Sequence, residues 1–427
     1  MDRFNINQLH NLFQTKLSTL NTTPPYIIMY IIAFLYIYIL TMFGKSVLLT
    51  KNVFIQLSIW VITIFTSIKL NNNYILFAPL IIFLINELVY FKYGHDIYDG
   101  VSRTETLYNI GYLHFNKKNK GTTNLTEGVY LNPNGTLMSI EESKKLDPSK
   151  AEESRFIEIF KDLNIHHLSK NELKNLSIID MGCGLGNFVK YCLSRGVNCI
   201  GVTISKEQQI QLLNRNLPVI HGDYRDLHTS LIEKADIITF IGSLEHITTG
   251  IPCHKDTLER QYTNWETILN NCKQYFKSAS NYKKIFGTNL HFNPNVCNTK
   301  EAYLLERAYG GAYFYDREGD RLPDISKKHG FNILNSRDMT YHYYMASVAD
   351  PNHFGNPAPV TLERLIGLIV SIFINPHLFN MIIYGYLGIW MWQFDGKLHY
   401  NRDNLGFERD RTKRPTTLWF WTIQQKN

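Results

Sequence analysis

The sequence predicts an α/β domain with a doubly wound parallel sheet, preceded by an α-helical transmembrane region. From residue 177 onward, short β-type runs alternate with helical stretches, as in such sheets. Before residue 93, by contrast, long apolar runs carry no charge over most of their length. The mean hydropathy of -0.18 argues against a mostly membrane-buried chain, and 13% aromatic residues argue against a disordered one.

Residues 1–93 are expected to hold a polar tail and two to three transmembrane helices. The apolar runs of this region occupy residues 26–43, 53–68 and 74–91. The first run would span roughly 27 Å as a helix, enough for a bilayer core. The later two runs fit a hairpin, and the third also fits a helix lying in the membrane interface. A buried pair of helices in a water-soluble domain is the alternative for these two runs.

Seven segments of the remaining chain have the composition of strands. The first, SIIDM, enters a glycine-rich turn, and helical stretches such as KEQQIQLLNRN separate the later ones. The predicted strands cover residues 177–181, 198–205, 217–223, 235–242, 283–292, 330–336 and 418–425.

A second apolar region, residues 365–392, lies within the predicted domain of residues 94–427. Asn375-Pro376 divides it, so neither half reaches the length of a clean membrane span. We expect membrane-interfacial helices here, with Trp390 and Trp392 near the headgroups. An apolar helical pair that covers the sheet is the alternative.

Charge and cysteine usage narrow the possible partners. The net charge is +7, but the densest basic run, residues 117–120, is short, so we expect no nucleic-acid partner and a membrane surface instead. The six cysteines include no CxxC pair, and His166-His167 and Cys253-His254 lack partners at metal-ligand spacing. The sequence therefore predicts free thiols and no metal site. It leaves the oligomeric state open.

The glycine-rich turn is the strongest chemical motif of the chain. It reads D-x-G-x-G-x-G and places Asp180, Gly182, Gly184 and Gly186 between a predicted strand and a predicted helix. Glycines permit a sharp turn and a close approach of the backbone to a ligand. Because a pyrophosphate-binding turn has the spacing G-x-G-x-x-G, this pattern favours S-adenosyl-L-methionine over a nicotinamide dinucleotide.

Four phrases, in this order and spacing, resemble one family: DMGCGLGNF, GVTISKEQ, GDYRDL and FIGSLEHI. They are similar to those of the cyclopropane-fatty-acid synthases and mycolic-acid methyltransferases, and the resemblance extends from about residue 90 to residue 427. It implies a Rossmann-like, seven-stranded methyltransferase sheet that binds S-adenosyl-L-methionine. The membrane segments ahead of this core resemble the layout of fungal sphingolipid C9-methyltransferases.

The resemblance also implies which residues hold the cofactor. Tyr108 and Asn109 would cover it, Thr203 and Gln208 would hold the ribose, and the glycines would approach it by backbone. Ser205 and Gln208 also form a capping box for the helix that follows, so Gln208 has a structural interpretation too. The full implied set is Tyr108, Asn109, Asp180, Gly182, Cys183, Gly184, Gly186, Thr203, Ile204, Gln208, Asp223, Tyr224 and Ile241.

For the chemical step, the resemblance implies a bound bicarbonate that acts as a base. Of the side chains that hold it in the family, Glu245 matches the glutamate and Tyr343 the tyrosine. The family cysteine aligns with Ile110, which cannot donate a hydrogen bond, so the use of bicarbonate stays open.

The family histidine has no single counterpart. His291 is nearby, but an ungapped alignment of the strand places Thr288 or Asn289 at that position. His246, beside Glu245, is a further candidate for a catalytic role and is otherwise a structural neighbour. The predicted catalytic set is therefore Glu245, Tyr343, His291 and His246.

Together these features predict an integral-membrane methyltransferase that modifies a lipid chain. The acceptor would be a carbon of an unsaturated fatty acyl or sphingoid chain, and the product a methyl branch, a methylene group or a cyclopropane ring. We expect the catalytic domain to face the cytosol, where the cofactor is made. The alternatives are a methyltransferase for a lipid headgroup or small molecule, and a catalytically inactive membrane scaffold.

Overall fold

The computed structural model describes Tyr108 and residues 128–247, 255–292, 314–315, 322–349, 414 and 416–426. All of them belong to the second of the two units into which the chain divides, residues 90–427. Within these ranges, no helix is both long enough and apolar enough to cross a bilayer. The predicted membrane spans, residues 365–392, Asn109 and Ile110 lie outside the described residues.

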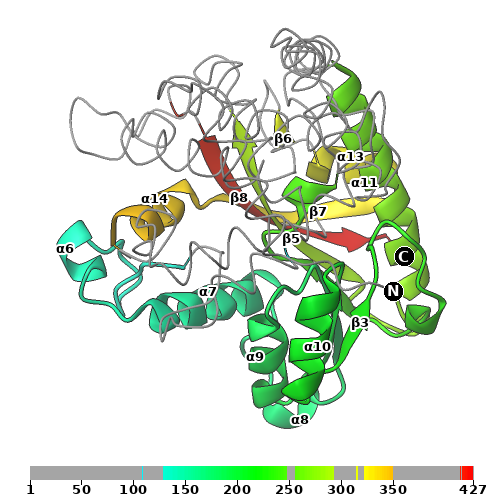
Figure 1. The fold of residues 1–427 in the computed structure, drawn as a ribbon, viewed down its shortest axis with the longest axis horizontal. Helices are drawn as coiled ribbons and strands as arrows, with labels where there is room; N and C mark the ends of the chain where they lie inside the picture. The colour runs from blue at the N-terminus through cyan, green and yellow to red at the C-terminus, as the bar shows by residue number, and fades with distance from the viewer. Residues whose placement is uncertain are drawn as a thin grey trace, which may run out of the picture. The chain divides into compact units, whose positions relative to one another are not determined.

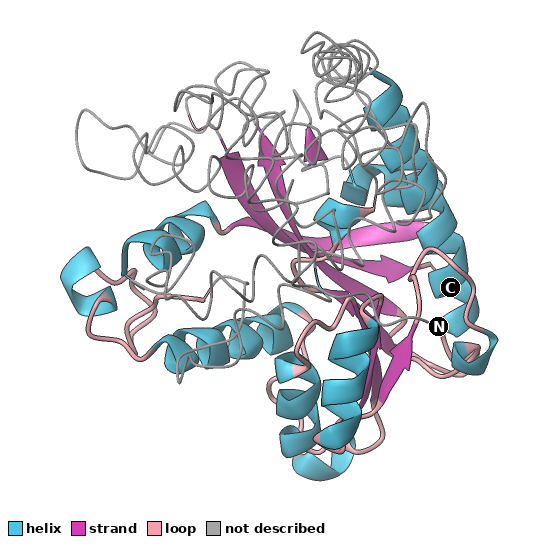
Figure 2. Ribbon diagram, viewed as in Figure 1, coloured by secondary structure: helices cyan, strands magenta, loops and turns pink. Residues whose placement is uncertain are grey.

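One sheet organises the described part of the chain (Figure 2). Its strand order is β3-β2-β1-β4-β5-β8-β7, and the short β6 pairs with β5 off this path. The strands are β1 Ser177–Met181, β2 Asn198–Thr203, β3 Val219–His221, β4 Ile237–Phe240, β5 Lys284–Phe292, β6 Phe314–Tyr315, β7 Phe331–Asp338 and β8 Thr416–Gln425.

All seven predicted strands are present, but the sheet is mixed instead of parallel. β8 lies between β5 and β7 and runs antiparallel to both. Its apolar residues alternate between two buried faces, since Leu418 and Phe420 pack in one core while Trp421 and Ile423 pack in the other. A strand that is buried on both faces has a similar apolar pattern whether it runs parallel or antiparallel to its neighbours. The composition of β8 therefore could not predict that it is antiparallel.

Several helices begin or end at residues that cap them. Asp147 caps α7 by accepting the Ser149 N–H, and Pro148 occupies the first turn, where its missing N–H costs nothing. α9 ends at Gly196, which has a φ of 91°. The helices are α6 Ile140–Ser143, α7 Pro148–Asp162, α8 Lys170–Leu173, α9 Asn187–Arg195, α10 Lys206–Asn214, α11 Lys255–Tyr275, α13 Leu322–Lys328 and α14 Thr340–Ala349, with 3-10 turns η3 Thr229–Leu231 and η4 Leu244–His246.

Helices cover both faces of the sheet (Figure 1). α7 and α9 pack on one face, with Phe160 and Phe188 in the same apolar cluster as Ile178 and Phe286 of the sheet. α11 and α13 pack on the other face, where Trp265 is fully buried. This three-layer arrangement is the doubly wound architecture that the alternation of elements predicted.

The sheet has one edge where its parallel strands end, which we call the carboxyl edge: Met181, Thr203, His221 and Phe240 close β1 to β4 there. From β1 the order runs outward to β2 and β3 on one side, and to β4 and β5 on the other. The connections therefore diverge between β1 and β4. In open α/β sheets ligands bind at this point, outside the carboxyl ends of the strands.

Candidate active site

The glycine-rich turn lies at this divergence, between β1 and α9. Its three glycines have positive φ angles, of 78° at Gly182, 53° at Gly184 and 72° at Gly186. A Cβ on Gly182 would lie 2.4 Å from Cβ of Ser243, and one on Gly186 would lie 2.5 Å from a methyl group of Leu212. These two positions therefore require glycine, because any larger residue would overlap a neighbouring side chain inside the protein.

Gly184 differs from its two neighbours. An added Cβ there would meet no atom within 4 Å. The backbone at Gly184 thus borders open space at the carboxyl edge, two residues before Gly186, the N-cap of α9. A ligand can approach the chain closely at this position, and the partial positive charge of the α9 N-terminus lies next to it.

Asp180 and Cys183, by contrast, turn toward the interior. Asp180 is 2% exposed and accepts a hydrogen bond from Thr239 Oγ1 at 2.8 Å, which joins β1 to β4. Burial raises the pKa of this carboxyl group to about 7. The Cys183 thiol packs against Gly201 of β2, and burial together with the Asp180 charge raises its pKa. Any cofactor contact of Cys183 would therefore come from its backbone.

The residues predicted to hold the ribose are bonded to each other. Thr203 Oγ1 donates to Gln208 Oε1 at 2.7 Å, and both side chains are buried at the end of β2. Ser205 caps α10 by accepting the Gln208 N–H at 3.1 Å. The capping box is therefore only half formed, because the Gln208 side-chain oxygen turns to Thr203 instead of the helix start. Ile204 is half-buried, and its carbonyl lies 3.0 Å from His221 Nε2.

Two further predicted cofactor contacts, Asp223 and Tyr224, follow β3. Arg225 holds the Asp223 carboxylate through three side-chain contacts, the shortest of 2.6 Å. The Tyr224 hydroxyl donates to the Ser243 carbonyl at 2.7 Å, which joins this turn to the segment after β4. Ile241 is 8% exposed and belongs to the core on the α7 face.

Glu245 lies in η4, immediately beyond β4. Its Oε1 accepts the backbone N–H of Leu290 in β5 at 3.1 Å. β4 pairs with β5 only as far as Gly287, so the next positions of β5 take partners from the η4 segment instead. In a second contact, the backbone N–H of Gly242, which also follows β4, donates to the side-chain Oγ1 of Thr288 at 2.7 Å. Glu245 is thus held by the sheet itself.

The three candidates for the family histidine occupy successive parts of β5. Thr288 is bonded to Gly242, and Asn289 accepts a hydrogen bond from Trp421 Nε1 of β8 at 2.5 Å. His291 follows in the same strand, where its backbone pairs with Thr417 and Phe314; its side chain lies outside the described part. Both Thr288 and Asn289 therefore have structural partners.

His246, next to Glu245, contacts Tyr108. His246 Nε2 lies 2.7 Å from the Tyr108 hydroxyl, and the two rings meet edge to face at 5.4 Å. Burial lowers the pKa of His246 to about 4, so the imidazole is neutral at physiological pH. This contact brings a predicted cofactor-covering residue to the turn that carries Glu245, across 138 residues of sequence.

Tyr343 lies in α14, 3% exposed, in the same apolar cluster as Leu290 and Ile241.

Several residues that support the site were not predicted. Ser243 Oγ donates to the Met181 carbonyl at 2.8 Å and so joins the segment after β4 to the end of β1. Such roles depend on which strands become neighbours, and no local pattern signals them. Within the described ranges, no cluster of side chains could hold a metal ion.

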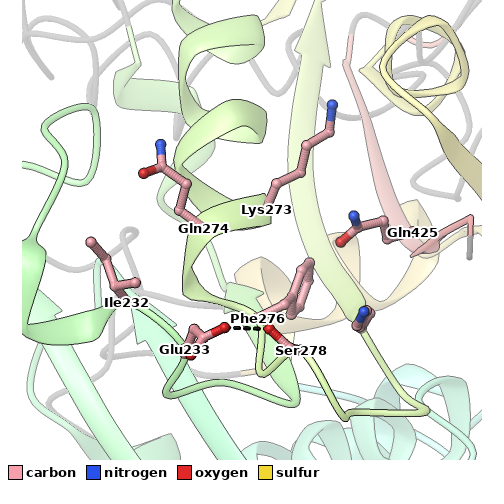
Figure 3. A pocket seen from close by; sticks show the side chains of 8 residues that line it. Ile232, Glu233, Lys273, Gln274, Phe276, Ser278 and Gln425 are labelled. Atoms are coloured by element: carbon pink, nitrogen blue, oxygen red, sulfur yellow. Dashed lines mark hydrogen bonds between the residues drawn. The ribbon is translucent and has the colours of Figure 1, made fainter.

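A hollow of about 290 Å³ opens away from this site (Figure 3). Glu233 and Ser278, which are hydrogen-bonded to each other, line it together with Phe276. Phe276 bridges Ala235, which precedes β4, so the hollow lies at the opposite edge of the sheet from the glycine-rich turn. Its open, mixed lining indicates a surface depression.

Comparisons with known proteins identify the domain type. Residues 154–270 match the family model described as a methyltransferase domain. A probable fatty acid methyltransferase of Mycobacterium tuberculosis is 30% identical over 132 residues, which span 29% of this chain and 29% of that protein. The prediction of a methyltransferase family is confirmed by these two matches. This chain spans less than a third of the length of the fatty acid methyltransferase that it matches.

Solved structures show a more distant likeness. The mycolic acid cyclopropane synthase CmaA1, complexed with SAH and CTAB, is 13% identical, with a TM-score of 0.47 over 76% of this chain and 98% of its own. The cyclopropane synthase MmaA2 from Mycobacterium tuberculosis is 15% identical, with a TM-score of 0.47 over 77% and 99%. At these scores the likeness alone establishes no shared function.

Proposed function

We propose that this methyltransferase-domain chain is an integral-membrane enzyme that transfers a methyl or methylene group from S-adenosyl-L-methionine to a carbon of a lipid chain. The acceptor is an unsaturated fatty acyl or sphingoid chain, and the catalytic domain faces the cytosol. The match of residues 154–270 supports the reaction type, and the apolar runs before residue 93 support the membrane location. The relative named as a probable fatty acid methyltransferase supports the substrate class.

One observation carries the proposal: the open approach at Gly184, in a turn placed where the sheet connections diverge. Its φ of 53° and the absence of any atom within 4 Å of an added Cβ fit a backbone built for close contact with a ligand. Thr203 ends the neighbouring strand β2, Gln208 lies in the first turn of α10, and Glu245 follows β4 at the same edge. The residues present therefore fit the cofactor that the sequence predicts.

S-adenosyl-L-methionine supplies an electrophilic methyl group, and the chain mainly supplies alignment and a water-poor site. The turn from Gly182 to Gly186 binds the cofactor through its backbone. The hydrogen bond between Thr203 and Gln208 holds these two side chains in place at the end of the neighbouring strand. Addition of the methyl group to one carbon of the double bond leaves a carbocation, and we assign Glu245 the role of taking up the proton that this cation loses. Its bond to the Leu290 N–H engages Oε1 and fixes the position of the carboxyl group at the carboxyl edge.

Tyr343 and His291 remain the other candidates to line the acceptor site. An aromatic ring such as that of Tyr343 can stabilise positive charge on the acceptor. Bicarbonate, implied by the resemblance, would act beside Glu245. A dependence of the rate on added bicarbonate, measured after its removal from the buffer, tests that assignment.

Lipid mass spectrometry of membranes that contain the full chain tests the proposal. S-adenosyl-L-methionine with a deuterated methyl group is supplied, and the labelled lipids are fragmented. Label on acyl or sphingoid fragments is the expected result. Label on headgroup fragments would contradict chain methylation and support headgroup transfer. No label, combined with no cofactor binding by calorimetry, would support an inactive scaffold.

A further inference from the structure

The side-chain amide of Gln261 in α11 is buried and makes no hydrogen bond within the described part of the chain. Its exposed fraction is 0%, and neither Oε1 nor Nε2 has a hydrogen-bond partner among the described residues. Burying a polar group without a partner is destabilising, so native proteins rarely keep one without a reason. A ligand group that binds there is such a reason.

α11 places Gln261 at the carboxyl edge of the sheet. The C-terminal end of this helix lies at the opposite edge, because Phe276, next to its last residue, bridges Ala235. Asn264, one turn after Gln261, donates from Nδ2 to the Ile247 carbonyl at 2.6 Å. Residues three apart share a helix face, so Gln261 lies one turn before the residue through which α11 meets the segment after β4.

A second unpartnered polar atom lies in that segment. His246 uses Nε2 for the Tyr108 hydroxyl, while its Nδ1 is buried and has no partner in the described part of the chain. His246 is adjacent to Ile247, which α11 contacts through Asn264. Two uncharged groups with unused hydrogen-bonding capacity thus lie on the two segments that the Asn264–Ile247 hydrogen bond joins at the carboxyl edge.

We infer that Gln261 and His246 bind an uncharged polar group of the acceptor lipid, a hydroxyl or an amide, close to its reacting chain. An amide side chain both donates and accepts, which matches a hydroxyl or an amide on both counts. A plain hydrocarbon would leave both side chains unpaired. An anionic group would find no positive charge on either residue. The inference rests on the proposed function for its lipid acceptor, but its test does not require methyl transfer.

Matched probes test it on the purified full chain in detergent. Oleyl alcohol and oleamide carry the polar group, and octadecene has a chain of the same length without one. Because one additional hydrogen bond of about 1.4 kcal/mol gives a tenfold difference in affinity, wild type should bind both polar probes about tenfold more tightly than octadecene. Gln261→Met should reduce this preference to about twofold or less, and His246→Phe should reduce it in the same direction.

The melting temperature of the lipid-free protein provides a second measurement. Gln261→Met removes a buried unpaired amide at similar volume, so the variant should melt at the wild-type temperature or above it. Gln274→Met, at an exposed position of the same helix, is the control and should change neither measurement. A clearly lower melting temperature of Gln261→Met, or an unchanged preference for the polar probes, would overturn the inference. If methyl transfer is absent but the preference depends on Gln261, only the proposed function fails.

Discussion

The carboxylate of Glu245 accepts the backbone N–H of Leu290 at 3.1 Å, across 45 residues of sequence. This bond replaces a sheet hydrogen bond where β4 has ended, so one side chain both completes the sheet and occupies the candidate active site. Structural and chemical roles therefore have to be separated by experiment at this residue.

Glu245→Gln separates them. The amide keeps an oxygen for the Leu290 N–H but cannot take up a proton, so we expect turnover to fall about 100-fold or more with little change in melting temperature. Cofactor binding by calorimetry should be retained. Glu245→Ala is the comparison: it also removes the acceptor and should destabilise the fold by about 1 kcal/mol. Wild-type turnover in Glu245→Gln would show that the assignment of this residue is wrong.

Gly184→Ala tests the open approach in the glycine-rich turn. A Cβ at a φ of 53° costs about 1 kcal/mol through backbone strain, but it contacts nothing inside the protein. Gly135 is a matched control, with a φ of 81° and equally open surroundings in an exposed turn. Both Ala variants should lose similar stability in denaturant titrations.

Only Gly184→Ala should also weaken cofactor binding, by about tenfold or more, when it is titrated by calorimetry. Equal cofactor affinity in the two glycine variants would show that the backbone at Gly184 does not meet the cofactor. Gly182→Ala is expected to misfold, because its Cβ would overlap Ser243.

His342 predicts a pH dependence of stability. Its buried Nδ1 accepts the Tyr130 N–H at 3.1 Å, which requires a neutral ring. Burial, followed by the Arg337 charge, lowers the pKa of His342 to about 4 in the folded protein. The unfolded state, with a pKa near 6.5, therefore binds a proton first as the pH falls. The stability that His342 contributes is complete above pH 6.5 and is lost progressively toward pH 4.

The comparison of wild type with His342→Asn isolates this contribution. The free energy of unfolding of the two proteins, measured in denaturant, should differ more at pH 7 than at about pH 4.5. Other titrating groups, such as His246 and Asp180, are present in both proteins and cancel in the difference. A difference that stays constant with pH would argue against a neutral, buried His342.

Deletion of residues 1–90 tests the membrane proposal. We expect the truncated chain to leave membranes only partly, because the apolar segment 365–392 is predicted to stay at the interface. Fractionation of cell lysates, followed by a carbonate wash, measures the bound fraction. Complete release of the truncated chain would contradict an interfacial role for residues 365–392.

The sequence predicted the strands well because each is a short apolar run bounded by polar or glycine-rich residues. It also placed the glycine-rich turn correctly, because that turn is local. The antiparallel direction of β8, the short β6 and the bond from Trp421 to Asn289 could not be predicted, since each depends on pairing between distant segments. The same holds for the contact of Tyr108 with His246.

The position of β8 also determines when the sheet can be completed during synthesis, because β8 is the last strand of the sequence. Among the described strands, β7 pairs with β8 alone, and residues 339–415 separate the two strands along the chain. A ribosome must therefore release the apolar segment 365–392 before β7 can acquire its neighbour. Until β8 is synthesised, the edges of β5 and β7 that pair with it have no partner strand. Residues 365–392 are therefore synthesised before the sheet is complete, because β8 follows them in the sequence.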